Sequence, residues 1–198
     1  EAHPGIDLRI SASMQHVDFA REDIDLAIRH GDGQWPGMHV ARLSAETLFP
    51  VCSPKLLSGR GALRAPRDIR HHTLLHTNGT DDWANWLRLA DIDSIDVKRG
   101  IIFNQASMAI DAAVDGQGIA LARTALASWD LICGRLVRPF SQVLDAPYAF
   151  WIVCPKAAAD LPKIVTFRSW LLNEAADDAR RMAEIKAIAR PSTTTRTR

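Results

Sequence analysis

The stretch DFAREDIDLAIRHGDGQWPG, residues 18–37, places a short apolar run directly before a loop with three glycines. The run, residues 24–28, has isoleucine at both ends and follows an acidic pair, a pattern that indicates a strand covered on both faces. Such strands are typical of the parallel sheets of α/β proteins. Because ligands of these sheets bind beyond the carboxyl ends of the strands, we expect Arg29, His30 and residues 31–37 to lie at a binding site.

The composition and charge are those of a globular chain. It has 198 residues, 47% of them hydrophobic, and a net charge of +1, which is enough for one large domain or two small ones. From residue 180 onward, six lysine and arginine residues stand against one glutamate, so residues 1–179 carry a net charge of about −4. This acidic balance argues against a nucleic-acid-binding surface in the folded part. Residues 179–198 are expected to form a basic, partly disordered tail.

Cysteines, histidines and apolar runs exclude several classes of protein. Cys52, Cys133 and Cys154 lie far apart, each beside apolar residues, and are predicted to be buried free thiols of a cytoplasmic protein. In an extended segment, His72 and His76 would share a face about 13 Å apart, which does not suit a shared metal ion. No apolar run approaches the roughly 18 residues of a membrane span. The sequence therefore predicts no metal, no cofactor and no contact with a membrane.

Hydrophobic periodicity predicts an alternation of strands and helices. In the helix at residues 81–90, with Thr80 as its cap, the spacing of Trp83, Trp86 and Leu87 places these side chains on one buried face. The predicted strands lie at residues 6–10, 24–28, 38–43, 47–52, 73–76, 101–103, 119–122, 136–137 and 150–154. The predicted helices lie at residues 17–21, 55–57, 81–90, 104–115, 124–132 and 163–189.

Motifs for common enzyme chemistries do not occur in the sequence. Gly116 and Gly118 follow a predicted helix and precede a strand, the reverse of the order in a dinucleotide-binding loop. Gly31 and Gly33 follow a strand, but the Gly-Lys-Ser/Thr sequel of a phosphate-binding loop is missing. There is also no Gly-x-Ser-x-Gly nucleophile motif. We therefore expect a protein that is not an enzyme.

Polar side chains follow several predicted strands. Arg29 offers a planar fork for a carboxylate, and the backbone amides that open the helix near Ser107 favour an anion. A structural role is the alternative for each group, because Arg29 can pair with Asp18 or Asp25, and Asn104 and Ser107 can cap their helix. A binding site is favoured because all these groups follow the carboxyl ends of strands. The full set is Ser11, Ser13, residues 29–32, Thr77, Asn78 and residues 104–107.

Longer motifs occur in a distinctive order and spacing from residue 4 to about residue 174. They are Pro4-Gly-Ile-Asp-Leu-Arg9, Val17-Asp-Phe19, Asp25-Leu-Ala-Ile-Arg-His-Gly-Asp-Gly33, Trp35-Pro-Gly37, Pro50-Val-Cys-Ser-Pro54, Trp83-Ala-Asn-Trp-Leu87, Ala112-Ala-Val-Asp-Gly-Gln-Gly-Ile-Ala-Leu121, Gly134-Arg-Leu-Val-Arg-Pro-Phe140, Phe150-Trp-Ile-Val153 and Phe167-Arg-Ser-Trp-Leu171. In these motifs the chain resembles the effector-binding domain of LysR-type transcriptional regulators, in the subgroup that contains the glycine-cleavage activator and the β-lactamase regulator.

The resemblance implies an α/β fold like that of type 2 periplasmic binding proteins, in which two crossover segments join two subdomains. The implied bounds are residues 1–52 and 149–178 for subdomain I, residues 53–148 for subdomain II, and residues 50–53 and 146–148 for the crossovers. The first strand and helix of subdomain I, and the winged helix-turn-helix with its linker helix, are expected to be missing at the amino-terminal side. A missing strand predicts incomplete burial beside residues 6–10.

The resemblance also implies a set of effector-binding residues. Carried over by motif, with His30 added from the predicted strand end, they are Ser13, Asp18, Arg29, His30, Asn104, Gln105, Ser107, Phe150 and Trp151. In the β-lactamase regulator a tyrosine stands where this chain has Phe150, and a serine lines up with Ala106. Because both hydroxyl groups are missing here, the resemblance does not by itself imply a muropeptide effector.

The predicted function is the effector-sensing domain of a bacterial DNA-binding transcriptional regulator. A small, anionic metabolite would close the cleft between the subdomains. In a homo-oligomer, a dimer or a tetramer, this closure would change the position of the DNA-binding domains. Contact with DNA is expected only through the missing amino-terminal domain. Two alternatives stay open at this point. One is a solute-binding protein of a transport system, which the free thiols disfavour, and the other is a cytosolic enzyme with a similar two-lobed fold.

Overall fold

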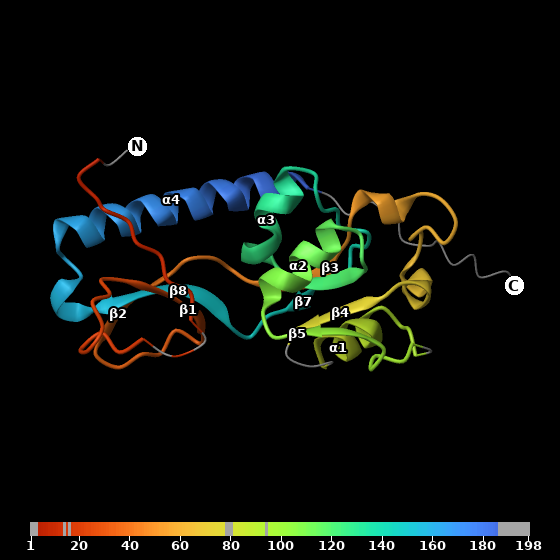
Figure 1. The fold of residues 1–198 in the computed structure, drawn as a ribbon, viewed down its shortest axis with the longest axis horizontal. Helices are drawn as coiled ribbons and strands as arrows, with labels where there is room; N and C mark the ends of the chain where they lie inside the picture. The colour runs from red at the N-terminus through yellow and green to blue at the C-terminus, as the bar shows by residue number, and fades with distance from the viewer. Residues whose placement is uncertain (1–3, 14, 16, 78–80, 94, 186–198) are drawn as a thin grey trace, which may run out of the picture. The chain divides into compact units, whose positions relative to one another are not determined.

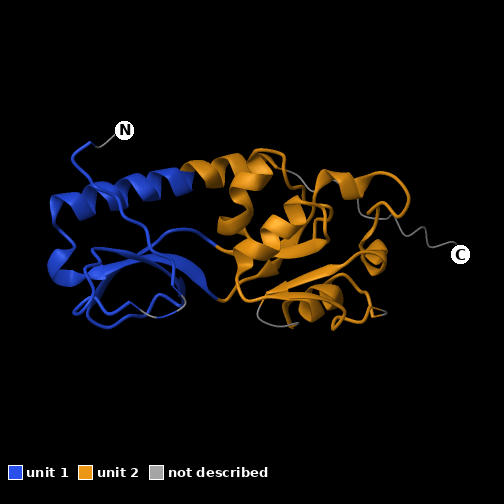
Figure 2. Cartoon of the chain, viewed as in Figure 1, with its two compact units in different colours: residues 1–45, 148–176 blue, residues 46–147, 177–198 orange. Residues whose placement is uncertain are grey.

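The computed structural model describes residues 4–13, 15, 17–77, 81–93 and 95–185 (Figure 1). The chain divides into two compact units, which Figure 2 shows in blue and orange. Unit 1 comprises residues 1–45 and 148–176, and unit 2 comprises residues 46–147 and 177–198. Each unit contains one of the two sheets and has its own buried apolar residues.

Unit 1 is built on a three-stranded antiparallel sheet whose central strand is β8 (Ala149–Pro155). Its neighbours are β1 (Ala27–Gly31) and β2 (Met38–Arg42), and both run antiparallel to it. After η3 (Lys156–Ala158), helix α4 (Pro162–Glu184) begins. Three buried residues of this returning segment, Cys154, Ala159 and Ile164, pack together and hold the helix start against the end of β8.

The prediction for residues 24–28 was wrong in two respects. β1 begins only at Ala27, and it pairs antiparallel with β8 rather than parallel with a neighbour. Ile28 is 50% exposed, so the strand is not covered on both faces. Arg29 and His30 therefore lie inside the strand and not beyond its end.

Residues 6–10 and 17–21, predicted as a strand and a helix, form irregular structure and turns. The alternating pattern of residues 6–10 finds no strand to pair with among the described residues. Leu8 is 53% exposed and Ile10 is 85% exposed. This exposure agrees with the incomplete burial expected beside these residues.

Unit 2 contains a five-stranded mixed sheet in the order β5-β4-β6-β3-β7. Its parallel part consists of β5 (Gly100–Phe103), β4 (Leu74–Thr77) and β6 (Ile119–Arg123). β3 (Thr47–Val51) runs antiparallel both to β6 and to the short β7 (Leu144–Asp145). A mixed sheet of this kind has to be covered on both faces, because its central strands are buried.

Helices cover both faces of the unit 2 sheet. α2 (Ala106–Val114) and α3 (Thr124–Ile132) pack against one face, and α1 (Asp81–Leu89) packs against the other. Two short 3₁₀ helices, η1 (Pro54–Leu57) and η2 (Pro66–His71), lie between β3 and β4 along the chain. Within the described residues, no helix is both long and apolar enough to cross a membrane.

The predicted tryptophan face of α1 is confirmed. Trp86 is fully buried and Trp83 is 2% exposed, and their rings meet edge to face at 5.8 Å. The indole Nε1 of Trp83 donates to the carbonyl of Leu75, and that of Trp86 donates to the carbonyl of Gln142, each at 3.2 Å. Both polar atoms of these large side chains are thus satisfied inside the core. Thr80, the predicted cap, lies outside the described residues.

The boundary between the two units differs from the prediction. Residues 47–51 were assigned to the first subdomain, but their strand pairs with β6 and β7, so the division falls after residue 45. Helix α4 runs to Glu184, within the predicted helix at residues 163–189, and Met182 packs into the unit 2 core. The predicted strand at residues 101–103 forms β5, which is the edge strand of the sheet, and Ile102 is 61% exposed. Residues 186–198 lie outside the described residues.

The cysteines are free thiols in two environments. Cys52 and Cys154 are buried, as predicted, whereas Cys133 is exposed at the end of α3. Burial raises the pKa of the Cys52 thiol to about 12. Burial also raises the pKa of Cys154, although the nearby Arg168 acts in the opposite direction.

In the folded protein, a thiol reagent at pH 8 is expected to label Cys133 and to leave the two buried cysteines unmodified. Only the thiolate reacts, and burial keeps Cys52 protonated and inaccessible up to strongly alkaline pH. Counting the modified thiols with Ellman's reagent, with and without urea, checks this. A Cys133→Ser variant should show almost no labelling before unfolding, and rapid labelling of that variant would contradict the burial of the other two.

Candidate functional site

Arg29 is the most firmly held of the predicted site residues. It lies in β1, and its Nη2 donates a hydrogen bond of 2.7 Å to the carbonyl of Val17. The guanidinium also lies over two aromatic rings, at 5.5 Å from the centroid of Phe19 and 6.0 Å from that of Trp35. Stacking of this kind holds the planar guanidinium in place and leaves its edge to bind an acceptor.

The alternative that Arg29 pairs with a neighbouring carboxylate is wrong. Asp18 lies 3.6 Å from Arg21, and Asp25 lies 2.8 Å from Lys163. No ion pair found among the described residues includes Arg29. A guanidinium that is stacked on rings but not neutralised by a carboxylate is suited to hold an anionic ligand.

Trp151 lies beside Arg29 on the same face of the sheet. The two residues are register partners across β1 and β8, and Arg42 of β2 is the partner of Trp151 on its other side. The indole Nε1 of Trp151 donates to the carbonyl of Gly31 at 2.9 Å. Gly33, with φ at +88°, comes so close that an added Cβ would lie 2.5 Å from the indole ring.

His30 and Phe150 are register partners too, but they face the opposite side of the sheet. Successive residues of a strand point to opposite faces, so His30 cannot share a face with Arg29. The His30 and Phe150 rings are 5.0 Å apart, and His30 also meets Tyr148 edge to face at 5.8 Å. The four strand residues predicted as one site are therefore split into two pairs, of which only the Arg29 pair presents a cation.

Ser13 and Asp18 are exposed and belong to local turns. The Ser13 hydroxyl accepts from the backbone N–H of Gln15 at 3.0 Å. The Asp18 carboxylate accepts from the backbone N–H of Ala20 at 3.0 Å. These bonds shape the segment that carries Val17, the residue whose carbonyl holds Arg29.

Asn104, Gln105 and Ser107 surround the start of α2, which follows the end of β5. All three are exposed. Gln105 occupies the N-cap position, and no side chain forms a capping hydrogen bond there, so the alternative that Asn104 and Ser107 serve as caps is wrong. The first amides of a helix without a capping side chain favour an anionic ligand.

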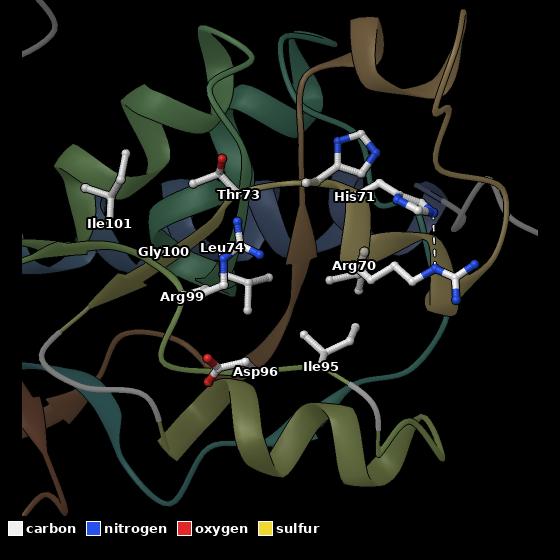
Figure 3. A pocket seen from close by; sticks show the side chains of 11 residues that line it. Arg70, His71, Thr73, Leu74, Ile95, Asp96, Arg99, Gly100 and Ile101 are labelled. Atoms are coloured by element: carbon white, nitrogen blue, oxygen red, sulfur yellow. Dashed lines mark hydrogen bonds between the residues drawn. The ribbon is translucent and has the colours of Figure 1, made fainter.

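Sequence reasoning missed a second polar region, in unit 2. Arg70, His71 and Arg99 line a pocket of about 640 Å³ (Figure 3). These residues precede strands rather than follow them, so a search restricted to carboxyl ends does not find them. Among the described residues, no group of three or more histidine, cysteine or acidic side chains could hold a metal ion.

Comparison with known proteins finds one family and several regulators. A family model described as LysR substrate binding domain matches residues 1–176. Over 175 residues the chain is 45% identical to the glycine cleavage system transcriptional activator of Escherichia coli K12. This alignment covers 88% of this chain and 57% of that protein. It is 33% identical over 179 residues to the transcriptional activator AmpR of Pseudomonas aeruginosa. This alignment covers 90% of this chain and 59% of AmpR.

A solved structure gives the same result for the fold. The effector domain of AmpR from Pseudomonas aeruginosa matches with a TM-score of 0.72 at 33% identity, over 92% of this chain and 87% of that domain. The chain thus spans almost the whole of a solved effector domain, but less than two thirds of the length of each curated relative described above.

Proposed function

Because the chain belongs to the LysR substrate binding domain family and has its α/β fold, we propose that it is the effector-sensing part of a LysR-type transcriptional regulator. The observation that carries the proposal is the family match over residues 1–176, together with 45% identity to a transcriptional activator. The relatives compared above are regulators and not transport proteins, which favours this function over the solute-binding alternative. For the same reason we propose no catalytic activity.

We propose that the effector is a small carboxylate whose charge is bound by Arg29. The geometry of Arg29 supports this, because the guanidinium is stacked, hydrogen-bonded to the Val17 carbonyl and in no ion pair among the described residues. Trp151 lies beside it on the same face. The other predicted effector contacts remain predictions, and so does their location in a cleft. They are Ser13, Asp18, His30, Asn104, Gln105, Ser107 and Phe150.

The name of the 45% identical relative suggests which ligands to test first. It is an activator of a glycine cleavage system, so glycine and other small amino acids form the first panel of carboxylates. Phe150 and Ala106 carry no hydroxyl group, so a muropeptide is not assumed as the effector. The same panel should include small dicarboxylates, because a guanidinium binds any carboxylate by the same paired geometry.

The action of the whole regulator is proposed by analogy with its relatives. The effector would bind one conformation of the domain more tightly than the other, and this difference in affinity sets how far it can shift the equilibrium. In a dimer or tetramer in the cytoplasm, that shift would change how the protein contacts DNA. We propose that DNA is bound outside these residues, since residues 1–179 carry net negative charge.

An Arg29→Ala variant is expected to weaken binding of the carboxylate effector by about 1.5–3 kcal/mol, roughly tenfold to a hundredfold, because a charge-assisted hydrogen bond is lost. Isothermal titration calorimetry with the carboxylate panel measures this directly. Arg29→Lys keeps the charge without the planar fork and should fall between the wild type and Arg29→Ala.

The matched control is Arg9→Ala, which removes an arginine whose side chain is 88% exposed. Effector affinity should be unchanged in this variant. An equal loss of affinity in both variants would show that only net charge matters and would remove Arg29 from the site. Binding of the full-length regulator to its own promoter, with and without the ligand, separates the regulator from the solute-binding alternative.

A further inference from the structure

A strongly basic segment, residues 55–72, connects β3 to β4 in unit 2 (Figure 1). It contains five lysine and arginine residues and a single acidic residue, Asp68, so its net charge is +4 with the histidines neutral. Because residues 1–179 together carry about −4, the other residues of that range carry about −8. The five cations of this basic segment are all exposed, and they are Lys55, Arg60, Arg64, Arg67 and Arg70.

The charge of the basic segment is not neutralised within the chain. No ion pair found among the described residues includes any of its five cations. The carboxylate of Asp68 accepts the backbone N–H groups of Arg64 and Ala65, at 3.0 and 2.8 Å, and thereby closes the start of η2. The Nε of Arg70 donates to Nε2 of His71 at 3.1 Å (Figure 3). Like charges gathered in this way repel one another, and an acidic partner would relieve that repulsion.

The backbone of η2 places two of the arginines on one face. In a 3₁₀ helix, residues three apart lie on the same face, about 6 Å apart along the axis. Arg67 and Arg70 have this spacing, and both are exposed. Ile69 of the same helix is fully buried in the core that contains the α1 tryptophans, and Leu63, just before η2, belongs to that core too. Because the helix is anchored, its backbone does not have to be ordered when a partner binds.

An acidic segment, residues 81–97, lies beside the basic one. It contains five aspartates and one arginine, so its net charge is −4. The two segments meet at the pocket in Figure 3, which is lined by Arg70 and His71 from the basic segment and by Ile95 and Asp96 from the acidic one. No ion pair within the described part of the chain joins them. Neighbouring areas of opposite charge favour a partner with the opposite arrangement.

This arrangement favours a protein over nucleic acid as the partner. A DNA duplex carries one negative charge for about every 1.7 Å of its axis, along its whole length. A duplex bound to the basic segment would therefore also bring phosphates close to the acidic segment, where like charges repel. A folded protein, in contrast, can confine its carboxylates to the area opposite η2.

We propose that the basic segment docks an acidic surface of another protein, with Arg67 and Arg70 as its main contacts. Carboxylates of the partner accept charge-assisted hydrogen bonds from the two guanidinium groups. The proposal goes beyond effector sensing and does not depend on it, because the basic segment contains none of the predicted effector contacts. In a regulator, such a contact makes the response depend on a protein partner as well as on a small molecule.

The test is a titration of the 198-residue protein with a hexaglutamate peptide and, separately, with a short DNA duplex. Both titrations are made at the same low ionic strength, because exposed charges are screened by salt. Amide signals in two-dimensional NMR report the binding. The peptide is expected to cause saturable shifts in residues 64–71, and the duplex is expected to cause none there. Absence of saturable shifts with the peptide would overturn the proposal, and so would a duplex that binds these residues as tightly as the peptide.

Matched variants separate this surface from a general attraction to positive charge. Arg67→Gln and Arg70→Gln should each weaken peptide binding about threefold, and the double variant about tenfold, as expected for exposed ion pairs. Arg9→Gln removes an arginine of unit 1 whose side chain is 88% exposed, and it should leave peptide binding unchanged. Arg29→Ala should also leave it unchanged, which keeps this result separate from that of the effector site. Equal weakening by Arg9→Gln and by the two η2 variants, or no weakening by the double variant, would show that η2 is not the docking surface.

Discussion

Replacing Trp86 with alanine is expected to lower the free energy of unfolding by about 3–5 kcal/mol. The indole is fully buried between the rings of Trp83 and Phe140, whose centroids each lie 5.8 Å from its own. The truncation removes this packing and leaves the carbonyl of Gln142 without its donor, while α1 and the sheet hold the cavity open. Urea unfolding followed by far-UV circular dichroism measures the change.

Trp129→Ala is the control for this prediction, because it removes the same side chain from an exposed position in the same unit. Trp129 is 56% exposed, and the contact it would lose is the stacking of Arg181 at 5.9 Å. The expected loss is about 0.5–1 kcal/mol. Similar losses in the two variants would mean that the α1 face does not carry the core of unit 2.

The buried face of α1 also shows which parts of the fold could be predicted from the sequence. In unit 2, the hydrophobic periodicity of the sequence agrees closely with the helices and strands of the structure. Residues 124–132, for example, form the predicted helix with the predicted bounds. The spacing of Trp83 and Trp86 was sufficient to identify a core face, because one amphipathic helix covers one side of a sheet. Local patterns predict such elements well when each element has a single buried face.

Unit 1 could not be predicted in the same way, because its strand order depends on residues far apart in the sequence. β8 comes about 110 residues after β2 and yet is the central strand between β1 and β2. Nothing in residues 24–28 indicates an antiparallel partner so distant. The apolar run was therefore assigned to a parallel sheet, and Arg29 and His30 were placed beyond the strand instead of inside it.

Prediction of the candidate site is limited in the same way, because its contacts join residues from different segments of the sequence. The sequence predicted Arg29 as a ligand-binding cation, but its contacts to Val17, Phe19 and Trp35 come from segments on both sides of the strand and could not be predicted from the strand alone. The split between Arg29 and His30 follows directly from strand alternation once the strand bounds are known. The pocket lined by Arg70 and Arg99 required the parallel pairing of β4 and β5, which places the segments before these two strands at the same end of the sheet.

Gly33→Ala is expected to lower the free energy of unfolding by about 3–5 kcal/mol. Gly33 has φ at +88°, and a residue with a Cβ pays about 1–2 kcal/mol for this left-handed conformation. The added Cβ would also lie 2.5 Å from the indole of Trp151, so the ring has to move. That movement breaks the 2.9 Å hydrogen bond from Nε1 to the Gly31 carbonyl and disturbs the packing, at a further cost of about 2–3 kcal/mol.

Gly37→Ala separates the two causes, because Gly37 lies in the same loop with φ at +79° but has no atom within 4 Å of an added Cβ. This variant should lose only the backbone contribution, about 1–2 kcal/mol. Urea unfolding of both variants gives the difference, which is the energy of the contact between the loop and Trp151. Because Trp151 is the register partner of Arg29, Gly33→Ala should also weaken effector binding, whereas Gly37→Ala should not. Equal losses of stability in the two variants would show that the loop moves away from Trp151 at little cost, and the indole would then not be a fixed wall beside Arg29.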